Sequence, residues 1–337
     1  MTPPPRREIT AGDLWRMLDL ITPMALRVAA TLRLADLIRE GHGALGELAA
    51  RAGADADTLG RLLRYLSARG VFAEPSPGHF ALTERAEFLT DEHPSGLRRW
   101  VDLEGFGGRM DLSFFELLAT VRAGRPPEAA HKASLPANLA SSYDAVMEAQ
   151  SRAQAPAIVA AYDWSGFEHV ADIGGGTGNL LAEVLRAAPR ARGTLVELLE
   201  DTAERARRYL HEAGVGDRCD VVAGDALEVM PRGADAYVWK FVLHSLDDTR
   251  AAEALRRCRE AARPDSRILI LERTVASGDH RAVFTTMDLH MLLWGQGGRE
   301  RTLDEFSALA ERAGLALRAA TPTPAGVHII ELGPTQA

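Results

Sequence analysis

Residues 170–178, with the sequence Val-Ala-Asp-Ile-Gly-Gly-Gly-Thr-Gly, constrain the fold of this chain more than any other segment. A short apolar stretch leads directly into three consecutive glycines, and residues 180–185 continue with apolar positions typical of a helix. This succession predicts a strand, a tight turn and the start of a helix. Glycines leave the backbone open to a ligand, and the free amide groups of a helix N-terminus favour negative charge. The segment therefore predicts a site for a nucleotide-like ligand.

The residues around the glycines narrow the kind of ligand. A phosphate-binding loop would continue with Lys-Ser or Lys-Thr, but Asn179 follows here, and the dinucleotide pattern G-x-G-x-x-G fits only loosely. Acidic residues instead accompany the ends of three successive predicted strands: Asp172, Glu197 and Asp225. The first suits a cationic amino-acid group, and the second suits ribose hydroxyls. This pattern favours S-adenosylmethionine, and the alternative is a structural glycine turn with surface carboxylates.

Length, charge and cysteine content limit the class of protein. A chain of 337 residues is long enough for two domains, and its net charge of -8 argues against a nucleic-acid partner. Cys219 and Cys258 offer neither a disulfide framework nor metal-binding spacing. The N-terminus lacks the apolar core of a signal peptide, and no apolar run approaches membrane length. We therefore expect a cytoplasmic protein with no membrane partner.

Periodicity divides the chain into three predicted parts. Residues 1–93 are expected to form a helical, winged-helix dimerisation domain, with a kink or break at Pro23 in the helical pattern of residues 14–38. Residues 94–155 are expected to form a helical connector that lines the substrate pocket. In residues 156–337 strands and helices alternate before a final hairpin, which predicts an α/β fold with a mainly parallel sheet between helices. A winged helix often binds DNA, but the acidic residues among its arginines favour dimerisation.

Three segments together resemble a known family. They are the glycine-rich run 170–178, the Lys-x-x-x-His run 240–244, and the Gly-Gly-Arg-Glu-Arg-Thr run 297–302. With them, nearly the whole chain resembles the class I S-adenosylmethionine-dependent methyltransferases, in particular the plant and bacterial small-molecule O-methyltransferases. The resemblance implies a Rossmann-like, seven-stranded methyltransferase domain, an N-terminal winged-helix dimerisation domain and a homodimer.

The cofactor-binding residues follow from the acidic pattern and from this resemblance. Those expected to bind S-adenosylmethionine are Asp172, Gly174, Gly176, Glu197, Asp225, Ala226 and Lys240. By the resemblance, Glu197 would hold the ribose, while Asp225 and Ala226 would flank the adenine. In the O-methylating members, the histidine that matches His244 is the general base that takes the proton from a phenol. The Asp-Trp pair that normally follows that histidine is Ser-Leu here.

A second histidine points to a metal. His290 lies on a predicted pocket helix, residues 284–293, at a position where an apolar residue normally stands, and Gln296 follows the helix. His244, His290 and Gln296 could converge as three ligands of zinc or iron and leave positions open for substrate. This arrangement resembles the metal-dependent 2-oxo acid C-methyltransferases of bacterial peptide-antibiotic pathways.

The second resemblance implies methylation of the β-carbon of a small 2-oxo acid through a metal-stabilised enolate. A metal-bound nitrogen of His244 cannot take a proton, so the enolising base would be another group, with Asp247 and Asp288 as candidates. Arg109 or Arg125 could receive the substrate carboxylate. Two alternatives stay open. One is a metal-free O-methyltransferase of a phenolic secondary metabolite with His244 as general base, and the other is a winged-helix DNA-binding regulator that senses S-adenosylmethionine.

Overall fold

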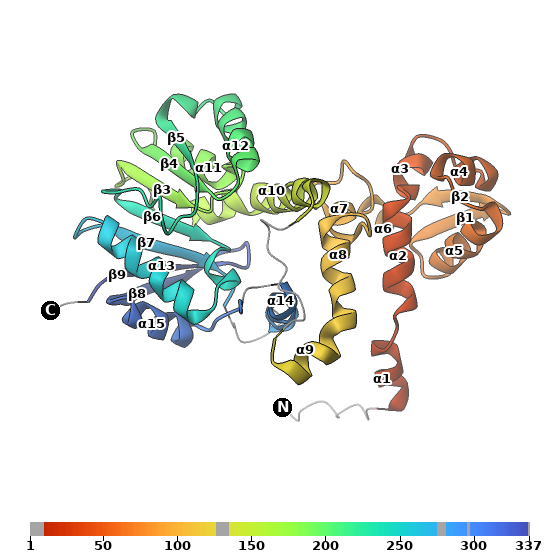
Figure 1. Ribbon diagram of the computed structural model, residues 1–337. Helices are drawn as coiled ribbons and strands as arrows, with labels where there is room; N and C mark the ends of the chain where they lie inside the picture. The colour runs from red at the N-terminus through yellow and green to blue at the C-terminus, as the bar shows by residue number, and fades with distance from the viewer. Residues whose placement is uncertain (1–9, 126–134, 275–280, 295–296, 336–337) are drawn as a thin grey trace, which may run out of the picture. The chain divides into compact units, whose positions relative to one another are not determined.

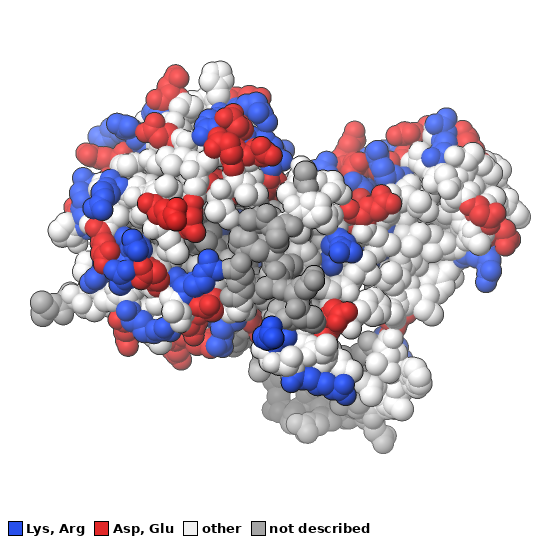
Figure 2. All heavy atoms as spheres, in the orientation of Figure 1, with Lys and Arg blue, Asp and Glu red and all other residues white. Residues whose placement is uncertain are grey.

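The chain forms two compact units, Met1–Gly108 and Arg109–Ala337. The computed structural model describes all residues except 1–9, 126–134, 275–280, 295–296 and 336–337. None of the described helices is long and apolar enough to cross a membrane. Figure 2 shows acidic and basic side chains intermixed on the visible face of both units, rather than gathered in a basic stripe.

The first unit combines helices with a two-stranded hairpin (Figure 1). Its elements are α1 (Ala11–Met17), α2 (Ile21–Thr31), α3 (Leu34–Arg39), α4 (Leu45–Ala52), α5 (Ala56–Ala68), β1 (Phe72–Ser76), β2 (His79–Leu82), α6 (Glu84–Glu87), α7 (Leu97–Val101) and the start of α8 (Phe106–Leu112). β1 and β2 pair antiparallel, as the sequence predicts. Leu34, Leu48 and Leu63 are fully buried in the core of this unit, so the helices pack around one apolar centre.

The predicted break at Pro23 is wrong in position. Pro23 lies in the first turn of α2, and the chain leaves the helical path before Ile21 and again at Arg33, where φ is 54°. The backbone nitrogen of a residue in the first turn has no helical acceptor, so proline is tolerated there without a kink.

The second unit is built on a seven-stranded sheet with the order β5-β4-β3-β6-β7-β9-β8. β3 to β7 run parallel to one another, β9 pairs antiparallel with β7, and β8 and β9 form the predicted antiparallel hairpin at one edge. The strands are β3 (His169–Ile173), β4 (Arg192–Glu197), β5 (Cys219–Ala223), β6 (Ala236–Lys240), β7 (Arg267–Glu272), β8 (Leu315–Pro322) and β9 (His328–Pro334). This sheet confirms the predicted Rossmann-like α/β fold.

Helices cover both faces of the sheet. The helices and 3-10 helices of the second unit are η1 (Ser113–Glu116), α9 (Leu117–Ala123), α10 (Ala137–Ala160), α11 (Asn179–Ala187), α12 (Glu200–Glu212), η3 (Gly216–Arg218), η4 (Leu243–Ser245), α13 (Asp248–Ala261), α14 (Arg281–Trp294) and α15 (Leu303–Arg312). Successive strand side chains point to opposite faces. Val170 and Val238 therefore join the core under α10, α11 and α12, whereas Ala171 and Tyr237 join the core under α13 and α15.

The expected division into residues 1–93, 94–155 and 156–337 stays a prediction, and the two units do not follow it. α10 continues past residue 155 to Ala160, because Ala155 and Ile158 are fully buried in the core beneath α11. Residues 109–155 of the expected connector belong to the second unit.

Candidate active site

The glycine-rich turn between β3 and α11 forms one wall of a pocket. Gly174, Gly176 and Gly178 have positive φ angles of 69°, 57° and 83°, which side chains rarely adopt. At Gly175 a Cβ would lie 2.7 Å from Oδ2 of Asp172, so a side chain there would strike the carboxylate. The pocket is lined by residues of α10, the glycine turn and the strand ends: Tyr143, Asp144, Met147, Glu148, Gln150, Ser151, Asp172, Gly174, Gly175, Gly176, Thr177, Asn179, Leu180, Glu197, Lys240 and Phe241.

Asp172 supplies a buried negative charge to this pocket. Its side chain is only 2% exposed, and within the described residues neither carboxylate oxygen has a hydrogen-bond partner. Burial raises the pKa of Asp172 to about 7, although the charge of Lys240 opposes the rise. Burial likewise lowers the pKa of Lys240 to about 8 against the attraction of Asp172. A carboxylate without a donor in a narrow polar pocket fits a ligand that brings an ammonium group.

Glu197 meets the same pocket from the end of β4. Its Oε2 accepts a hydrogen bond of 3.1 Å from the backbone nitrogen of Gly176, which fixes the carboxylate beside the turn. Asp225, whose expected place beside an adenine stays a prediction, accepts a hydrogen bond of 2.9 Å from the backbone nitrogen of Leu227. Neither Asp225 nor Ala226 is among the described residues that line this pocket.

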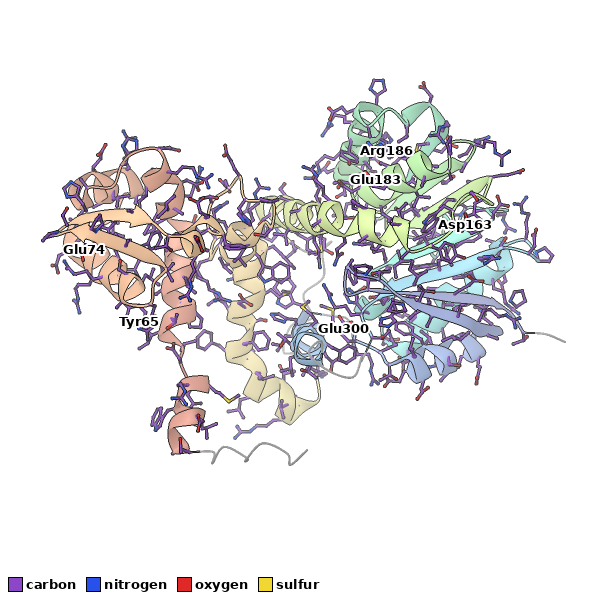
Figure 3. All side chains as sticks on the ribbon, turned by 180° about the vertical axis from the view of Figure 1, so that it is seen from behind. Tyr65, Glu74, Asp163, Glu183, Arg186 and Glu300 are labelled. Carbon is purple, nitrogen blue, oxygen red and sulfur yellow. The ribbon has the colours of Figure 1, made fainter. Side chains whose placement is uncertain are left out.

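His244 lies next to two buried carboxylates at the carboxyl edge of the sheet. Its Nδ1 is 3.0 Å from Oε1 of Glu300 and 3.6 Å from Oε2 of Glu272. The backbone nitrogen of His244 also donates to Oε1 of Glu272 at 3.2 Å. Both glutamate side chains are 0% exposed. The backbone nitrogen of Glu300, which is labelled in Figure 3, donates to Oδ1 of Asp288 in α14. The imidazole is thus held through one ring nitrogen and through the backbone.

The two carboxylates set the charge state of the imidazole. Burial alone would lower the pKa of His244, but the charges of Glu272 and Glu300 outweigh it and raise the pKa above its ordinary value. Burial also raises the pKa of Glu272. Sequence reasoning missed both glutamates as site residues. Glu272 is the acid that ends the apolar strand 267–272, and Glu300 stands inside the Gly-Gly-Arg-Glu-Arg-Thr run, so both signals were present.

The segment that carries Glu300 also clamps the turn that carries His244. The fully buried Arg301 donates to the carbonyl oxygens of Leu243 and Leu246 at 2.7 and 2.8 Å. The backbone nitrogen of Arg299 donates to the carbonyl oxygen of His244 at 2.8 Å. The turn is therefore fixed from both sides, and we call residues 297–301 the clamp segment.

Of the residues expected to bind a metal, His244 and His290 have different hydrogen-bond partners. In His290, Nδ1 lies 2.9 Å from the carbonyl oxygen of Thr286, and Nε2 lies 3.2 Å from Oδ1 of Asp111, both within hydrogen-bond distance. Gln296 lies outside the described residues. In the part of the chain that the structure describes, the potential ligand atoms around His244 belong to Glu272 and Glu300. Both nitrogens of His290 are thus already engaged by neighbouring groups.

The structure also describes the residues expected as enolising bases, Asp247 and Asp288, and those expected to bind the substrate carboxylate, Arg109 and Arg125. Asp247 caps α13 by accepting a bond of 2.8 Å from the nitrogen of Arg250. Asp288 accepts a bond of 2.9 Å from the backbone nitrogen of Glu300 and so supports the clamp segment. Arg109 and Arg125 are both exposed.

Two family models match this chain. Residues 122–316 match an O-methyltransferase domain, and residues 15–92 match an O-methyltransferase dimerisation domain. The two matches together cover both structural units.

Individual proteins are similar over nearly the whole length. A 2,7-dihydroxy-5-methyl-1-naphthoate 7-O-methyltransferase of Streptomyces carzinostaticus is 43% identical over 93% of this chain and 95% of its own. An aclacinomycin 10-hydroxylase of Streptomyces purpurascens is also 43% identical, over 89% of this chain and 82% of its own. Among solved structures, an O-methyltransferase from neocarzinostatin biosynthesis, in complex with S-adenosyl-L-homocysteine and 1,4-dihydroxy-2-naphthoic acid, has a TM-score of 0.88 and 40% identity. That match covers 97% of this chain and 100% of the other.

Proposed function

The chain belongs to the S-adenosylmethionine-dependent O-methyltransferase family, and we propose that it methylates a phenolic hydroxyl of a naphthoate-like aromatic metabolite in antibiotic biosynthesis. The observation that carries the proposal is the pairing of His244 with the buried Glu300 and Glu272. This arrangement suits a general base for a hydroxyl group.

The expected C-methylation of a 2-oxo acid is wrong. Two of the relatives are named as a dihydroxynaphthoate O-methyltransferase and a phenazine O-methyltransferase, and the matching domain is an O-methyltransferase domain. His290 gave the metal hypothesis its second imidazole, but this ring is hydrogen-bonded to Asp111 and Thr286. The DNA-binding alternative loses its basis as well, since the winged region matches a dimerisation domain.

The hydrogen bond between His244 and Glu300 favours the tautomer that a base needs. With the proton of the neutral ring on Nδ1, donated to Oε1 of Glu300, Nε2 keeps its lone pair and can accept the proton of a phenol. As the ring becomes an imidazolium, the charges of Glu272 and Glu300 stabilise it. The bound cofactor would supply the methyl group to the phenolate oxygen, with its sulfur as the leaving group, and the imidazolium would then release its proton to water.

The pocket beside the glycine turn fits the cofactor. When bound, S-adenosylmethionine supplies a methyl group activated by a positively charged sulfur. Asp172 would receive its ammonium group, Glu197 its ribose hydroxyls, and Lys240 would complete the charged wall. Gly174 and Gly176 keep the turn free of side chains, so the cofactor can approach the backbone.

Overall identity alone does not decide the reaction, because a hydroxylase and an O-methyltransferase are equally similar to this chain. The imidazole held by two carboxylates supports methyl transfer, since proton removal from a phenol is the chemical requirement of that step.

We also propose that the protein acts as a homodimer. Apolar side chains of α1 and the segment that follows it are largely exposed in the single chain, among them Trp15 at 72% and Met17 at 82%. Patches of this kind mark contact surfaces, and residues 15–92 match a dimerisation domain.

The proposed reaction is tested by incubating the purified protein with S-adenosylmethionine and a panel of hydroxynaphthoic acids, simple phenols and 2-oxo acids, with and without a chelator. We expect a product heavier by one CH2 unit, formed from an aromatic substrate, with the new methyl bound to oxygen by NMR and a rate that the chelator does not change. A product heavier by one oxygen atom, or a methyl group on carbon, would refute the proposal.

Asp172 should make cofactor binding depend on pH. The pKa of Asp172 is about 7, so the carboxyl group is mostly neutral at pH 6 and mostly ionised at pH 8. Its attraction for an ammonium group should therefore strengthen between these two pH values. In Asp172→Asn, affinity for S-adenosylmethionine at pH 8 should fall by about 10- to 100-fold, the usual worth of a charged hydrogen bond, and the rise in affinity from pH 6 to pH 7, below the pKa of Lys240, should disappear. Calorimetric titration measures both effects.

Asp163→Asn, a change of an exposed aspartate in the same unit, is the control. Equal affinity of Asp172→Asn and the native protein at pH 8 would contradict this role.

A further inference from the structure

Arg273 is a charged side chain at the reaction centre that the proposed mechanism does not use. It directly follows β7, immediately after Glu272. Its guanidinium carbon lies 4.5 Å from the ring centroid of Phe241, and the ring of His244 is 5.6 Å from the same phenyl ring. Phe241 also lines the cofactor pocket. Arg273, the proposed base and the cofactor pocket therefore meet around one aromatic side chain.

The neighbouring carboxylates do not use the donors of Arg273. Within the described parts of the chain, neither Glu272 nor Glu300 forms an ion pair with it at 4.0 Å or less, although each has a buried Oε2 without a hydrogen-bond partner. Burial lowers the pKa of Arg273 against the attraction of both glutamates. The side chain of Arg273 is half-buried, and its guanidinium carries five N–H donors, so a ligand that reaches it meets donors that these carboxylates do not occupy.

The position of Phe241 is itself constrained. Its φ angle of 53° is unusual for a residue with a side chain, and its backbone nitrogen donates to the carbonyl oxygen of Leu271 in β7. Lys240 contacts the ring as well, with Nζ 4.5 Å from the centroid. Backbone strain of this kind persists where the surrounding structure enforces it, and it is concentrated at functional sites. The ring thus holds Arg273 at a fixed place relative to His244.

From this placement we infer that Arg273 binds a carboxylate of the acceptor, so that the substrate class is aromatic hydroxy acids rather than neutral phenols. A planar guanidinium pairs with a carboxylate through two parallel hydrogen bonds, which adds orientation to attraction. Such a contact would turn the accepting hydroxyl toward Nε2 of His244. The inference rests on the proposed function, and it replaces the exposed Arg109 and Arg125 as candidates for this contact.

The test compares 1,4-dihydroxy-2-naphthoic acid with its methyl ester, which keeps the ring and the hydroxyls but lacks the charge. In Arg273→Met, we expect kcat/KM for the acid to fall by about 10- to 100-fold, mainly through KM, as for the loss of one charge-assisted pair. The value for the ester should change by less than about threefold, because the ester makes no such pair. Arg273→Gln is measured in parallel, and affinity for S-adenosyl-L-homocysteine and the melting temperature report on folding. Arg267→Met, at the opposite end of β7, is the matched control.

A second readout separates this inference from the proposed reaction. Calorimetry on protein loaded with S-adenosyl-L-homocysteine measures binding of the acid directly. Binding that depends on Arg273 without any methylation would leave the inference standing and overturn the reaction. Equal losses for acid and ester, together with a shifted pH profile, would mean that Arg273 acts only on the charge of His244, and this result overturns the inference. Acid binding that is equally tight in Arg273→Met and the native protein also overturns it.

Discussion

Replacement of His244 by glutamine is expected to lower kcat by about a thousandfold, the middle of the range for loss of a positioned general base. Glutamine is close in size and can still donate to Glu300, but it cannot take up the proton of a phenol. The cofactor pocket does not include His244, so affinity for S-adenosyl-L-homocysteine should stay within about twofold. Single-turnover rates and calorimetry measure the two quantities.

The pH profile distinguishes a base from a packing residue. The neutral ring is the active form, so kcat/KM should rise with pH through the pKa of His244, which Glu272 and Glu300 raise above its ordinary value against burial and the charge of Arg273. Glu300→Gln removes one negative charge, so the rising limb should move to lower pH while the maximal rate falls. A His244→Gln variant with an almost native rate, or an unmoved limb in Glu300→Gln, would show that the proton goes elsewhere.

The sheet could be predicted from the sequence because its signals are local. Each central strand of the second unit is a short apolar run, and the glycine turn after β3 marks the carboxyl edge where ligands bind. The break near Pro23 was misplaced because proline disfavours the interior of a helix but is tolerated in its first turn. Where a helix begins depends on the residues that pack beneath it, and a single sequence shows these poorly.

The cofactor pocket could be predicted in greater part than the reaction centre. Asp172, Gly174, Gly176, Glu197 and Lys240 stand at strand ends or in the turn, so their meeting follows from the topology. The partners of His244 could not be derived in that way. Glu272 precedes α14 in the chain and Glu300 follows it, and only the folded chain brings the two beside His244. The sequence analysis therefore expected the imidazole of His290 beside His244. In the structure, the carboxylates of Glu272 and Glu300 lie there. The assignment of His244 as a base therefore depends on its match to the O-methyltransferase domain as well as on these two neighbours.

The clamp segment explains how one turn of 3-10 helix can position a base. η4 is short and has little internal hydrogen bonding to fix it. Its rigidity comes from Arg301 and from the backbone of Arg299, while Glu300 orients the ring. Close approach of the two backbones is possible because residue 298 is glycine. A Cβ at this position would lie 2.5 Å from the carbonyl oxygen of His244 and 2.9 Å from atoms of Ser245.

Gly298→Ala is therefore expected to lower kcat by about a hundredfold, the cost of a misplacement of about 1 Å in a catalytic group. The atoms in the way belong to the backbone, so no flexible side chain can move aside, and the turn that carries His244 must shift. Overpacking should also reduce the free energy of unfolding by about 1–3 kcal/mol. Binding of S-adenosyl-L-homocysteine should persist, since Gly298 is not part of the cofactor pocket.

The matched control for this change is Gly166→Ala in the same unit, where a Cβ would meet no atom within 4 Å. That variant should retain native kcat and stability. Thermal unfolding and initial rates on one aromatic hydroxy acid measure both proteins under the same conditions. If Gly298→Ala loses stability but keeps its rate, the turn can absorb the added carbon without moving the imidazole. The clamp segment would then act on the base through the side chain of Glu300, together with Glu272, and not through its backbone contacts with the turn.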